Sequence, residues 1–186
     1  MIIIVNGPSG CGKTTAIAWM KKAIHKCADY PLTVPLKRGV ASIFSIDGNT
    51  MQWFIKNPDE EGARLHGMSW RQAQINLFLH LENIYGPTIL SDMAIKKFDE
   101  EILKINNHII VDCGKQVEAQ ALMNRYGHGI GLGLLQIERP GYEFIDYRGY
   151  IRLECQHQEW IINKYDEELF EIQVKNVLKK WKLIDE

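Results

Sequence analysis

Eight residues near the start of the sequence have the types and the spacing needed to surround a phosphate group. Residues 7–14, which we call the glycine loop, read GPSGCGKT and fit the pattern G-x-x-x-x-G-K-[ST]. In this pattern the glycines let successive backbone N–H groups turn toward phosphate oxygens, and the helix that begins near the lysine directs its positive dipole end at the same anion. The sequence therefore predicts a loop that binds the phosphates of a nucleoside triphosphate through Gly7, Ser9, Gly10, Cys11, Gly12, Lys13, Thr14 and Thr15.

Two residues of the loop also have expected roles in contacting the phosphates and in binding a metal ion. Lys13 is expected to reach the β- and γ-phosphates, and the hydroxyl of Thr14 is expected to ligate Mg²⁺. A magnesium site of this kind usually has a carboxylate at the end of a neighbouring buried strand, and Asp112 closes the apolar run of residues 109–111 in that way. We therefore predict Thr14 and Asp112 as the metal ligands, with helix capping as the alternative role for Asp112.

Cys11 lies inside the glycine loop, where backbone N–H groups and the ammonium of Lys13 would lower the pKa of a thiol. Such an environment would make the cysteine sensitive to oxidation. The preferred interpretation is that Cys11 is a small residue that fits the turn, with the sensitive thiol as the alternative.

Several arginines lie where they could neutralise phosphate groups. Transfer of a phosphoryl group to an anionic acceptor needs cations around both phosphates, and arginine suits this task best. Arg71 opens a predicted helix. Arg139 follows a predicted strand and introduces a polar loop that contains Arg148 and Arg152. These positions indicate two basic clusters, one that would bind the acceptor and one in a closing lid. The alternative for each of these arginines is that it is a solvated surface side chain with no role in binding.

Strands and helices alternate along the sequence. Residues 2–6 form an apolar run before the glycine loop, which is typical of a strand buried on both faces. After the loop, helical spacing is shown by Ile17, Met20, Ile24 and Cys27. Further strands are predicted at 109–112, 134–137 and 160–163, with a weaker candidate at 32–35, and further helices at about 36–46, 69–84, 90–105, 116–126 and 166–182. This alternation predicts βαβ units and a mainly parallel sheet that binds its ligand at the carboxyl ends of the strands.

The overall composition is that of an ordinary globular domain. The chain has 186 residues, of which 46% are hydrophobic and 24% are charged, and its formal net charge is −1. The length predicts one domain, and the near-neutral charge disfavours a scaffold for duplex nucleic acid while leaving room for a local basic cleft. No stretch approaches the ~20 apolar residues of a membrane helix, and neither a signal peptide, a zinc site nor a disulfide is expected. We therefore expect a soluble cytoplasmic protein with no membrane partner.

Several short sequence motifs occur in a definite order over nearly the whole chain. In chain order they are the glycine loop and residues 34–38, 44–47, 65–72, 85–87, 111–112, 118–119, 137–141 and 160–169. Apart from the glycine loop each stretch is a weak motif, so the specificity lies in their succession. In this succession the chain resembles phage-type deoxynucleoside monophosphate kinases.

The resemblance implies an α/β, three-layer P-loop kinase fold, in which a mainly parallel five-stranded sheet carries a helical acceptor-binding insertion and a short lid. The chain would be a single domain with its core at about 1–34 and 106–186. The acceptor-binding helical region would span about 35–105, and the lid about 139–157. The protein would act in the cytoplasm, which is that of the host cell if the chain is phage-encoded.

The resemblance also implies roles for individual residues. Lys37, Arg38 and Arg71 would contact the deoxynucleoside monophosphate, and Arg139 would approach the donor nucleotide. The catalytic candidates are Lys13, Asp112, Arg139 and Arg148.

The chain departs from the family pattern at one point. The family typically has an arginine two positions after the aspartate that ends the strand, where this chain has Gly114 followed by Lys115. The phosphate contact made there in the family is therefore retained, lost or passed to Lys115, which is the candidate residue in this chain.

Together these patterns predict the transfer of a phosphoryl group from ATP to a deoxynucleoside monophosphate, which gives ADP and a deoxynucleoside diphosphate. The expected cofactor is Mg²⁺ and the expected partners are the two nucleotides, whereas nucleic acid is not an expected partner. A homodimer is compatible with the sequence, which does not specify the base of the acceptor.

Two other functions stay open at this point. One is a P-loop kinase that acts on a hydroxymethylated base, in a nucleotide or in DNA. The other is a non-catalytic module in which a bound nucleotide regulates a partner surface. In such a module Trp53, Phe54 and Trp70 would be exposed interface anchors, whereas in a kinase they would pack inside the helical region.

Overall fold

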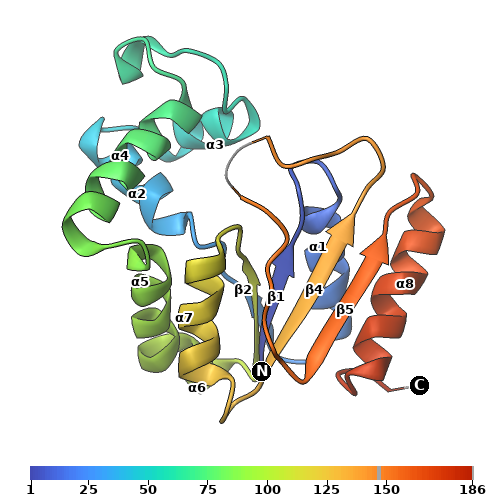
Figure 1. Ribbon diagram of the computed structural model, residues 1–186. Helices are drawn as coiled ribbons and strands as arrows, with labels where there is room; N and C mark the ends of the chain where they lie inside the picture. The colour runs from blue at the N-terminus through green and yellow to red at the C-terminus, as the bar shows by residue number, and fades with distance from the viewer. Residues whose placement is uncertain (146–147, 186) are drawn as a thin grey trace. The chain divides into compact units, whose positions relative to one another are not determined.

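The structure is a computed structural model that describes residues 1–145 and 148–185. It divides into two compact units (Figure 1). The first, which we call the sheet unit, contains Met1–Leu32 and Ser91–Glu186, and the second, the helical unit, is Thr33–Leu90. Within the described residues, no helix combines the length and the apolar character needed to cross a membrane.

The sheet unit is built on five parallel strands, in the order β2-β3-β1-β4-β5. The strands are β1 (Ile2–Asn6), β2 (Cys27–Asp29), β3 (His108–Asp112), β4 (Leu132–Glu138) and β5 (His157–Ile162). This arrangement confirms the predicted α/β fold with a parallel five-stranded sheet. Because β1 is central, its carboxyl end lies between those of β3 and β4.

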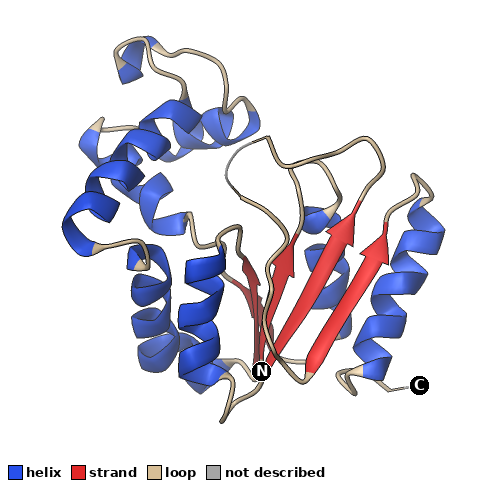
Figure 2. Cartoon of the chain, in the orientation of Figure 1, coloured by secondary structure: helices blue, strands red, loops and turns tan. Residues whose placement is uncertain are grey.

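Helices cover both faces of this sheet, as Figure 2 shows. On one face, strand residues such as Ile3, Val5 and Ile110 pack against α1 (Lys13–Ala23) and α8 (Glu167–Lys180). On the other face lies α7 (Gln116–Tyr126), so the unit has three layers (Figure 1). All five residues of β1 are buried, which explains the uninterrupted apolar run in the sequence.

A hydrogen-bonded cluster joins α7 to the segment that precedes β3. This segment consists of α5 (Ile89–Lys97), the π-helical turn Phe98–Ile102 and the short α6 (Leu103–Ile105). The hydroxyl of Tyr126 donates to a carboxylate oxygen of Asp99 at 2.9 Å, and Arg125 also donates to Asp99. Burial and the neighbouring Asp99 raise the pKa of Tyr126, so the phenol stays a protonated donor.

The weaker strand candidate at 32–35 is wrong. The fifth strand is β2, which pairs with β3 and lies at the edge of the sheet. The predicted helix after the glycine loop also ends early, because Ile24 is already extended and Cys27 pairs with His108. Residues 34–35 instead open a helix, since proline is favoured in the first helical turn.

The helical unit consists of α2 (Val34–Ile43), α3 (Gly48–Lys56), the 3₁₀ turn Ala63–Leu65 and α4 (Trp70–Tyr85). Its own core includes Phe54 and Trp70, whose rings stack at 5.5 Å with an interplanar angle of 8°. The packing interpretation of these two side chains is therefore confirmed, whereas Trp53 is 46% exposed.

The helical unit is shorter than the helical region expected at about 35–105, because residues 91–105 belong to the sheet unit. Helices predicted at 36–46, 69–84 and 116–126 correspond to α2, α4 and α7. Between β4 and β5, the described residues 139–145 and 148–156 contain no helix or strand. We call residues 139–156 the β4–β5 connection.

Candidate functional site

The glycine loop connects β1, the central strand, to α1 at the carboxyl end of the sheet. The helix begins at Lys13, as predicted, and is preceded by Gly12. Because glycine has no side chain to cap the helix, the first N–H groups of α1 are left to face an anion. The loop therefore has the geometry that the sequence pattern requires for phosphate binding.

Positions 10 and 12 require glycine for two reasons, their backbone φ angles and the lack of room for a Cβ atom. Their φ angles are +78° and +109°, in the region that side chains rarely adopt. A Cβ atom on Gly12 would lie 2.7 Å from Nδ2 of Asn163 and 2.9 Å from the ring of Phe170. A Cβ atom on Gly10 would lie 2.5 Å from the ring of Tyr142.

We expect Gly12→Ala to lower the free energy of unfolding by about 1–3 kcal/mol, because it adds backbone strain and a clash with the buried Phe170. Urea denaturation followed by circular dichroism measures this change. Gly129→Ala is the control, since Gly129 has no positive φ and a Cβ atom added to it would enter open space. Equal stabilities of the two variants would contradict the expectation.

The ammonium group of Lys13 lies over its own loop. It donates hydrogen bonds to the carbonyl oxygens of Gly7 at 2.8 Å and Pro8 at 2.9 Å. The following residues, Thr14 and Thr15, are exposed in the first turn of α1. The loop thus combines one cation with helix N–H groups and hydroxyl groups.

Asp112 ends β3 at the same edge of the sheet. It is in register with Val5, two residues before the glycine loop. The N-cap residue of α7 is Lys115, whose side chain makes no capping hydrogen bond. The role of Asp112 as a metal ligand stays a prediction.

The structure supports the preferred interpretation of Cys11 and not the activated thiol. The side chain is fully buried and belongs to the core of the sheet unit, facing away from solvent. Burial raises the pKa of the thiol, and the opposing effect of Lys13 is smaller. Cys11 thus acts as a small residue that fits the turn.

We expect Cys11 to react slowly with iodoacetamide at pH 8 in the native protein, because a buried thiol with a raised pKa is seldom ionised. Unfolding in urea should increase the rate by more than ~10-fold. Mass spectrometry of the peptide that contains Cys11 gives both rates. Labelling that is equally fast in the folded and unfolded protein would overturn this account.

Arg139 is docked on the glycine loop. Its Nη1 donates to the carbonyl oxygen of Gly10 at 2.9 Å. The guanidinium also lies over two rings, 4.8 Å from the centroid of Tyr142 and 4.3 Å from that of Tyr165. The hydroxyl of Tyr165 donates to the carbonyl oxygen of Pro140 at 2.6 Å. The sequence predicted a role for Arg139, but not the two tyrosines that orient it.

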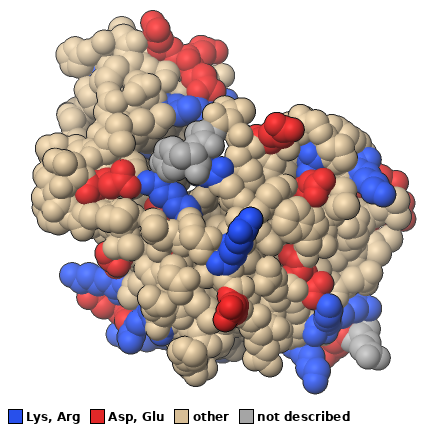
Figure 3. Space-filling model, viewed as in Figure 1, with Lys and Arg blue, Asp and Glu red and all other residues tan. Residues whose placement is uncertain are grey.

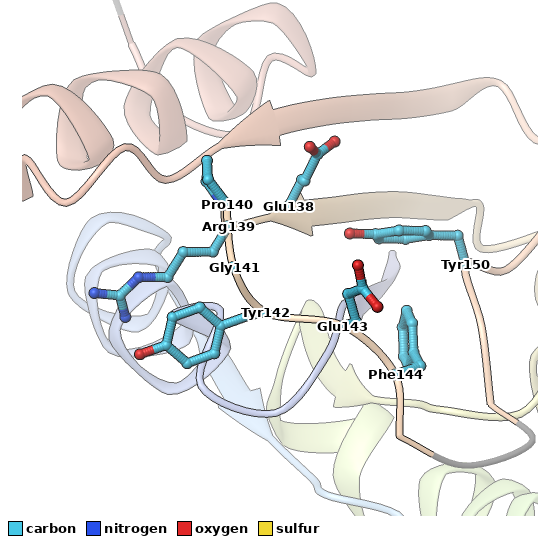
Figure 4. Close-up of a pocket in the computed structure, with 8 residues that line it drawn as sticks. All are labelled: Glu138, Arg139, Pro140, Gly141, Tyr142, Glu143, Phe144 and Tyr150. Atoms are coloured by element: carbon cyan, nitrogen blue, oxygen red, sulfur yellow. The ribbon is translucent and has the colours of Figure 1, made fainter.

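A pocket of about 370 Å³ adjoins Arg139 (Figure 4). Its walls carry three aromatic rings and two carboxylates, and Glu138 accepts a hydrogen bond from Nε1 of Trp160 at 3.1 Å. The ring of Tyr150 contacts both Phe144 and Trp160. The lining residues are Glu138, Arg139, Pro140, Gly141, Tyr142, Glu143, Phe144 and Tyr150.

Two buried amides tie the β4–β5 connection to the sheet. Nδ2 of Asn6 donates to the carbonyl oxygens of Cys113 and Gly149, and Oδ1 of Asn6 accepts from the backbone N–H of Ile151 at 3.1 Å. Gln136 donates to the carbonyl oxygen of Ile151 at 2.9 Å. Sequence reasoning missed both residues, although a polar residue inside or at the end of an apolar strand was a usable signal.

The remaining predicted cations fall into the two units. In the sheet unit, Lys115 precedes α7 and the side chain of Arg148 lies beside Gly114. In the helical unit, Lys37 and Arg38 lie on α2 and Arg71 lies on α4. A contribution of the helical unit to one common site stays a prediction.

Arg71 is held by a carboxylate within the helical unit. Its Nε and Nη2 donate to the two oxygens of Asp59 at 2.5 and 3.1 Å. This pairing lowers the pKa of Asp59 and raises that of Arg71. A phosphate that binds Arg71 would therefore replace Asp59 or share the guanidinium with it.

No protein-family model and no curated protein matches this sequence. Among solved structures, an unliganded sugar kinase from Janibacter sp. HTCC2649 is similar, with a TM-score of 0.46 and 10% sequence identity. The match covers 100% of this chain and 98% of that chain.

Proposed function

We propose that the protein transfers the γ-phosphoryl group of ATP to a deoxynucleoside monophosphate. The observation that carries this proposal is the glycine loop between β1 and α1, with Asp112 at the end of the adjacent strand. This arrangement supports binding of a nucleoside triphosphate, and the resemblance to phage-type deoxynucleoside monophosphate kinases supports the choice of acceptor.

In the proposed reaction an oxygen of the acceptor phosphate forms a bond to the γ-phosphorus as the bond to the β–γ bridging oxygen breaks. ADP leaves with that oxygen, and no protein nucleophile takes part. The protein therefore contributes positioning and electrostatic stabilisation. Lys13 and the N–H groups of the glycine loop would bind the donor phosphates, and Arg139 would approach the donor nucleotide.

Thr14 and Asp112 fit the ligand set of a magnesium ion. Both offer oxygen atoms, Thr14 is exposed, and Asp112 is only partly buried. Magnesium bound there would neutralise negative charge between the β- and γ-phosphates. The remaining ligands would come from water and from the phosphates themselves.

The candidates for acceptor binding are taken unit by unit. They are Lys37, Arg38 and Arg71 in the helical unit, and Lys115 in the sheet unit. On the face in Figure 3, basic side chains are interspersed with acidic ones. The formal net charge of −1 disfavours a polyanion as the acceptor.

The test is ADP release from ATP·Mg²⁺, measured with a coupled assay over a panel of ribo- and deoxynucleoside monophosphates. Stimulation by at least one deoxynucleoside monophosphate is the expected result. Stimulation by DNA alone would favour the kinase of a modified base. Absence of stimulation by any monophosphate or DNA would favour the non-catalytic module and refute the proposal.

A further inference from the structure

A buried amide side chain directly follows β5, at the carboxyl end of the sheet. Asn163 is 8% exposed, and its backbone N–H donates to the carbonyl oxygen of Glu138 at 2.8 Å, which fixes its main chain to the end of β4. Its Oδ1 accepts a hydrogen bond from the backbone N–H of Tyr165 at 3.2 Å. Because the oxygen of the planar amide is held in this way, the direction of its NH₂ group is fixed as well.

The NH₂ group of Asn163 binds the glycine loop. Nδ2 donates to the carbonyl oxygen of Cys11 at 3.0 Å, and this buried contact joins residues 152 positions apart in the sequence. A Cβ atom on Gly12 would lie 2.7 Å from the same nitrogen, so the lack of a side chain at position 12 leaves room for the amide. The carbonyl group of Cys11 is thus held toward the interior of the sheet unit.

This contact sets the direction of the next N–H group in the loop. The peptide bond between Cys11 and Gly12 is trans, so its C=O and N–H groups point in opposite directions. Since the carbonyl is held toward the interior, the N–H of Gly12 faces the open side of the loop, next to the first turn of α1. In the described part of the chain this N–H donates to no protein group, and Gly12 is only partly buried. It can therefore donate to an anion.

We propose that Asn163 is a positioning residue for phosphate binding, which holds the carbonyl of Cys11 so that the N–H of Gly12 points at the phosphate chain of the donor nucleotide. Asn163 acts through this N–H and does not itself contact the phosphates. The inference rests on the proposed function for the identity of the reaction, but it requires only that the glycine loop binds a phosphate chain.

Asn163→Leu removes the amide and keeps nearly the same shape. It eliminates one hydrogen bond donated to a backbone carbonyl and one accepted from a backbone N–H. Gln173→Leu is the matched control, because Gln173 on α8 donates to the carbonyl oxygen of Ile162 at 3.0 Å and accepts from the N–H of Ile162 at 3.1 Å. The control eliminates the same two kinds of hydrogen bond one residue away, and neither of them reaches the glycine loop.

The first experiment measures the binding of inorganic tripolyphosphate by calorimetry and the stability of each variant by urea denaturation. Both variants are expected to lower the urea midpoint, because each leaves backbone groups without partners. Asn163→Leu should also weaken binding by roughly 10-fold, since a charge-assisted hydrogen bond becomes misaligned. Gln173→Leu should bind as the unmodified protein does. Equal losses of binding in the two variants would show a purely structural role for Asn163 and overturn the proposal.

The second experiment observes the N–H of Gly12 directly by NMR spectroscopy of the ¹⁵N-labelled protein. Tripolyphosphate is expected to shift this amide resonance in the unmodified protein and in Gln173→Leu, and to shift it less in Asn163→Leu. The amide of Gly129 is the internal control, because it donates to the carbonyl oxygen of Tyr126 at 3.3 Å. A Gly12 resonance that does not respond in the unmodified protein would overturn the proposal even if Asn163→Leu fails to fold.

The third experiment measures turnover with the best monophosphate. Asn163→Leu is expected to raise the KM for ATP by roughly 10-fold and to leave the KM for the monophosphate unchanged, because the contact is made to the donor. A purely structural role would instead lower the apparent kcat through loss of folded protein and change neither KM.

The outcomes separate this inference from the proposed function. Tripolyphosphate binding that depends on Asn163, in a protein that phosphorylates no monophosphate, would uphold the inference and refute the proposed function. An active kinase in which Asn163→Leu changes neither tripolyphosphate binding nor the KM for ATP would do the reverse.

Discussion

Lys13→Met is expected to lower kcat by roughly 10³-fold or more while the protein stays folded. Methionine keeps most of the length of the side chain but removes the charge that would face the β- and γ-phosphates in the proposed reaction. A preorganised cation contributes strongly where charge develops in the transition state. The fold is expected to survive because the two hydrogen bonds of the Lys13 ammonium lie within the glycine loop, to the carbonyl oxygens of Gly7 and Pro8, and join no other element.

The coupled assay measures the loss of turnover, and urea denaturation monitored by circular dichroism verifies the fold. Lys179→Met is the matched control, since Lys179 is exposed in the last turn of α8 and far along the chain from the loop. Its kcat should equal that of the unmodified protein. Undiminished turnover in Lys13→Met would refute the proposed mechanism.

Asp112→Asn is expected to lower kcat by roughly 10²–10³-fold and to raise the Mg²⁺ concentration needed for half-maximal activity. Asparagine has nearly the same shape but lacks the negative charge that attracts a divalent ion. Asp112 is in register with Val5, so the carboxylate belongs to the strand edge from which the glycine loop departs. The loss should therefore appear in catalysis and metal dependence together.

A titration of activity against Mg²⁺ tests this expectation, with Asp185→Asn as the control at an exposed position. A purely structural role for Asp112 predicts another pattern, in which the urea midpoint falls and the Mg²⁺ dependence does not change. That pattern would exclude Asp112 as a metal ligand.

Much of the sheet unit could be predicted because its strands are buried on both faces. β1, β3 and β4 appear in the sequence as apolar runs, and the glycine loop marks the end of the first. β2 was misplaced because an edge strand of three residues pairs on one side only and leaves little hydrophobic pattern. α3 was not predicted from the sequence, although Asp47 caps it by accepting from the N–H of Thr50.

The candidate site was predictable where its chemistry is local and not where it depends on tertiary contacts. The glycine loop is a continuous stretch, so its pattern alone located it. Other contacts join residues that are distant in the sequence, so no local sequence pattern predicts them. Examples are the hydrogen bond between Arg71 and Asp59 and the proximity of the Arg148 side chain to Gly114. The pKa of Cys11 was misjudged for the same reason, because its burial depends on α1, α8 and the sheet.

The contacts of Asn6 also constrain the order of folding. Asn6 is separated by 107 residues from Cys113 and by 143 residues from Gly149, and it bonds to both. Contacts over such distances carry a large entropic cost of loop closure and form after more local ones. We therefore expect the β4–β5 connection to take its native path late in folding, after β1 has paired with β3 and β4.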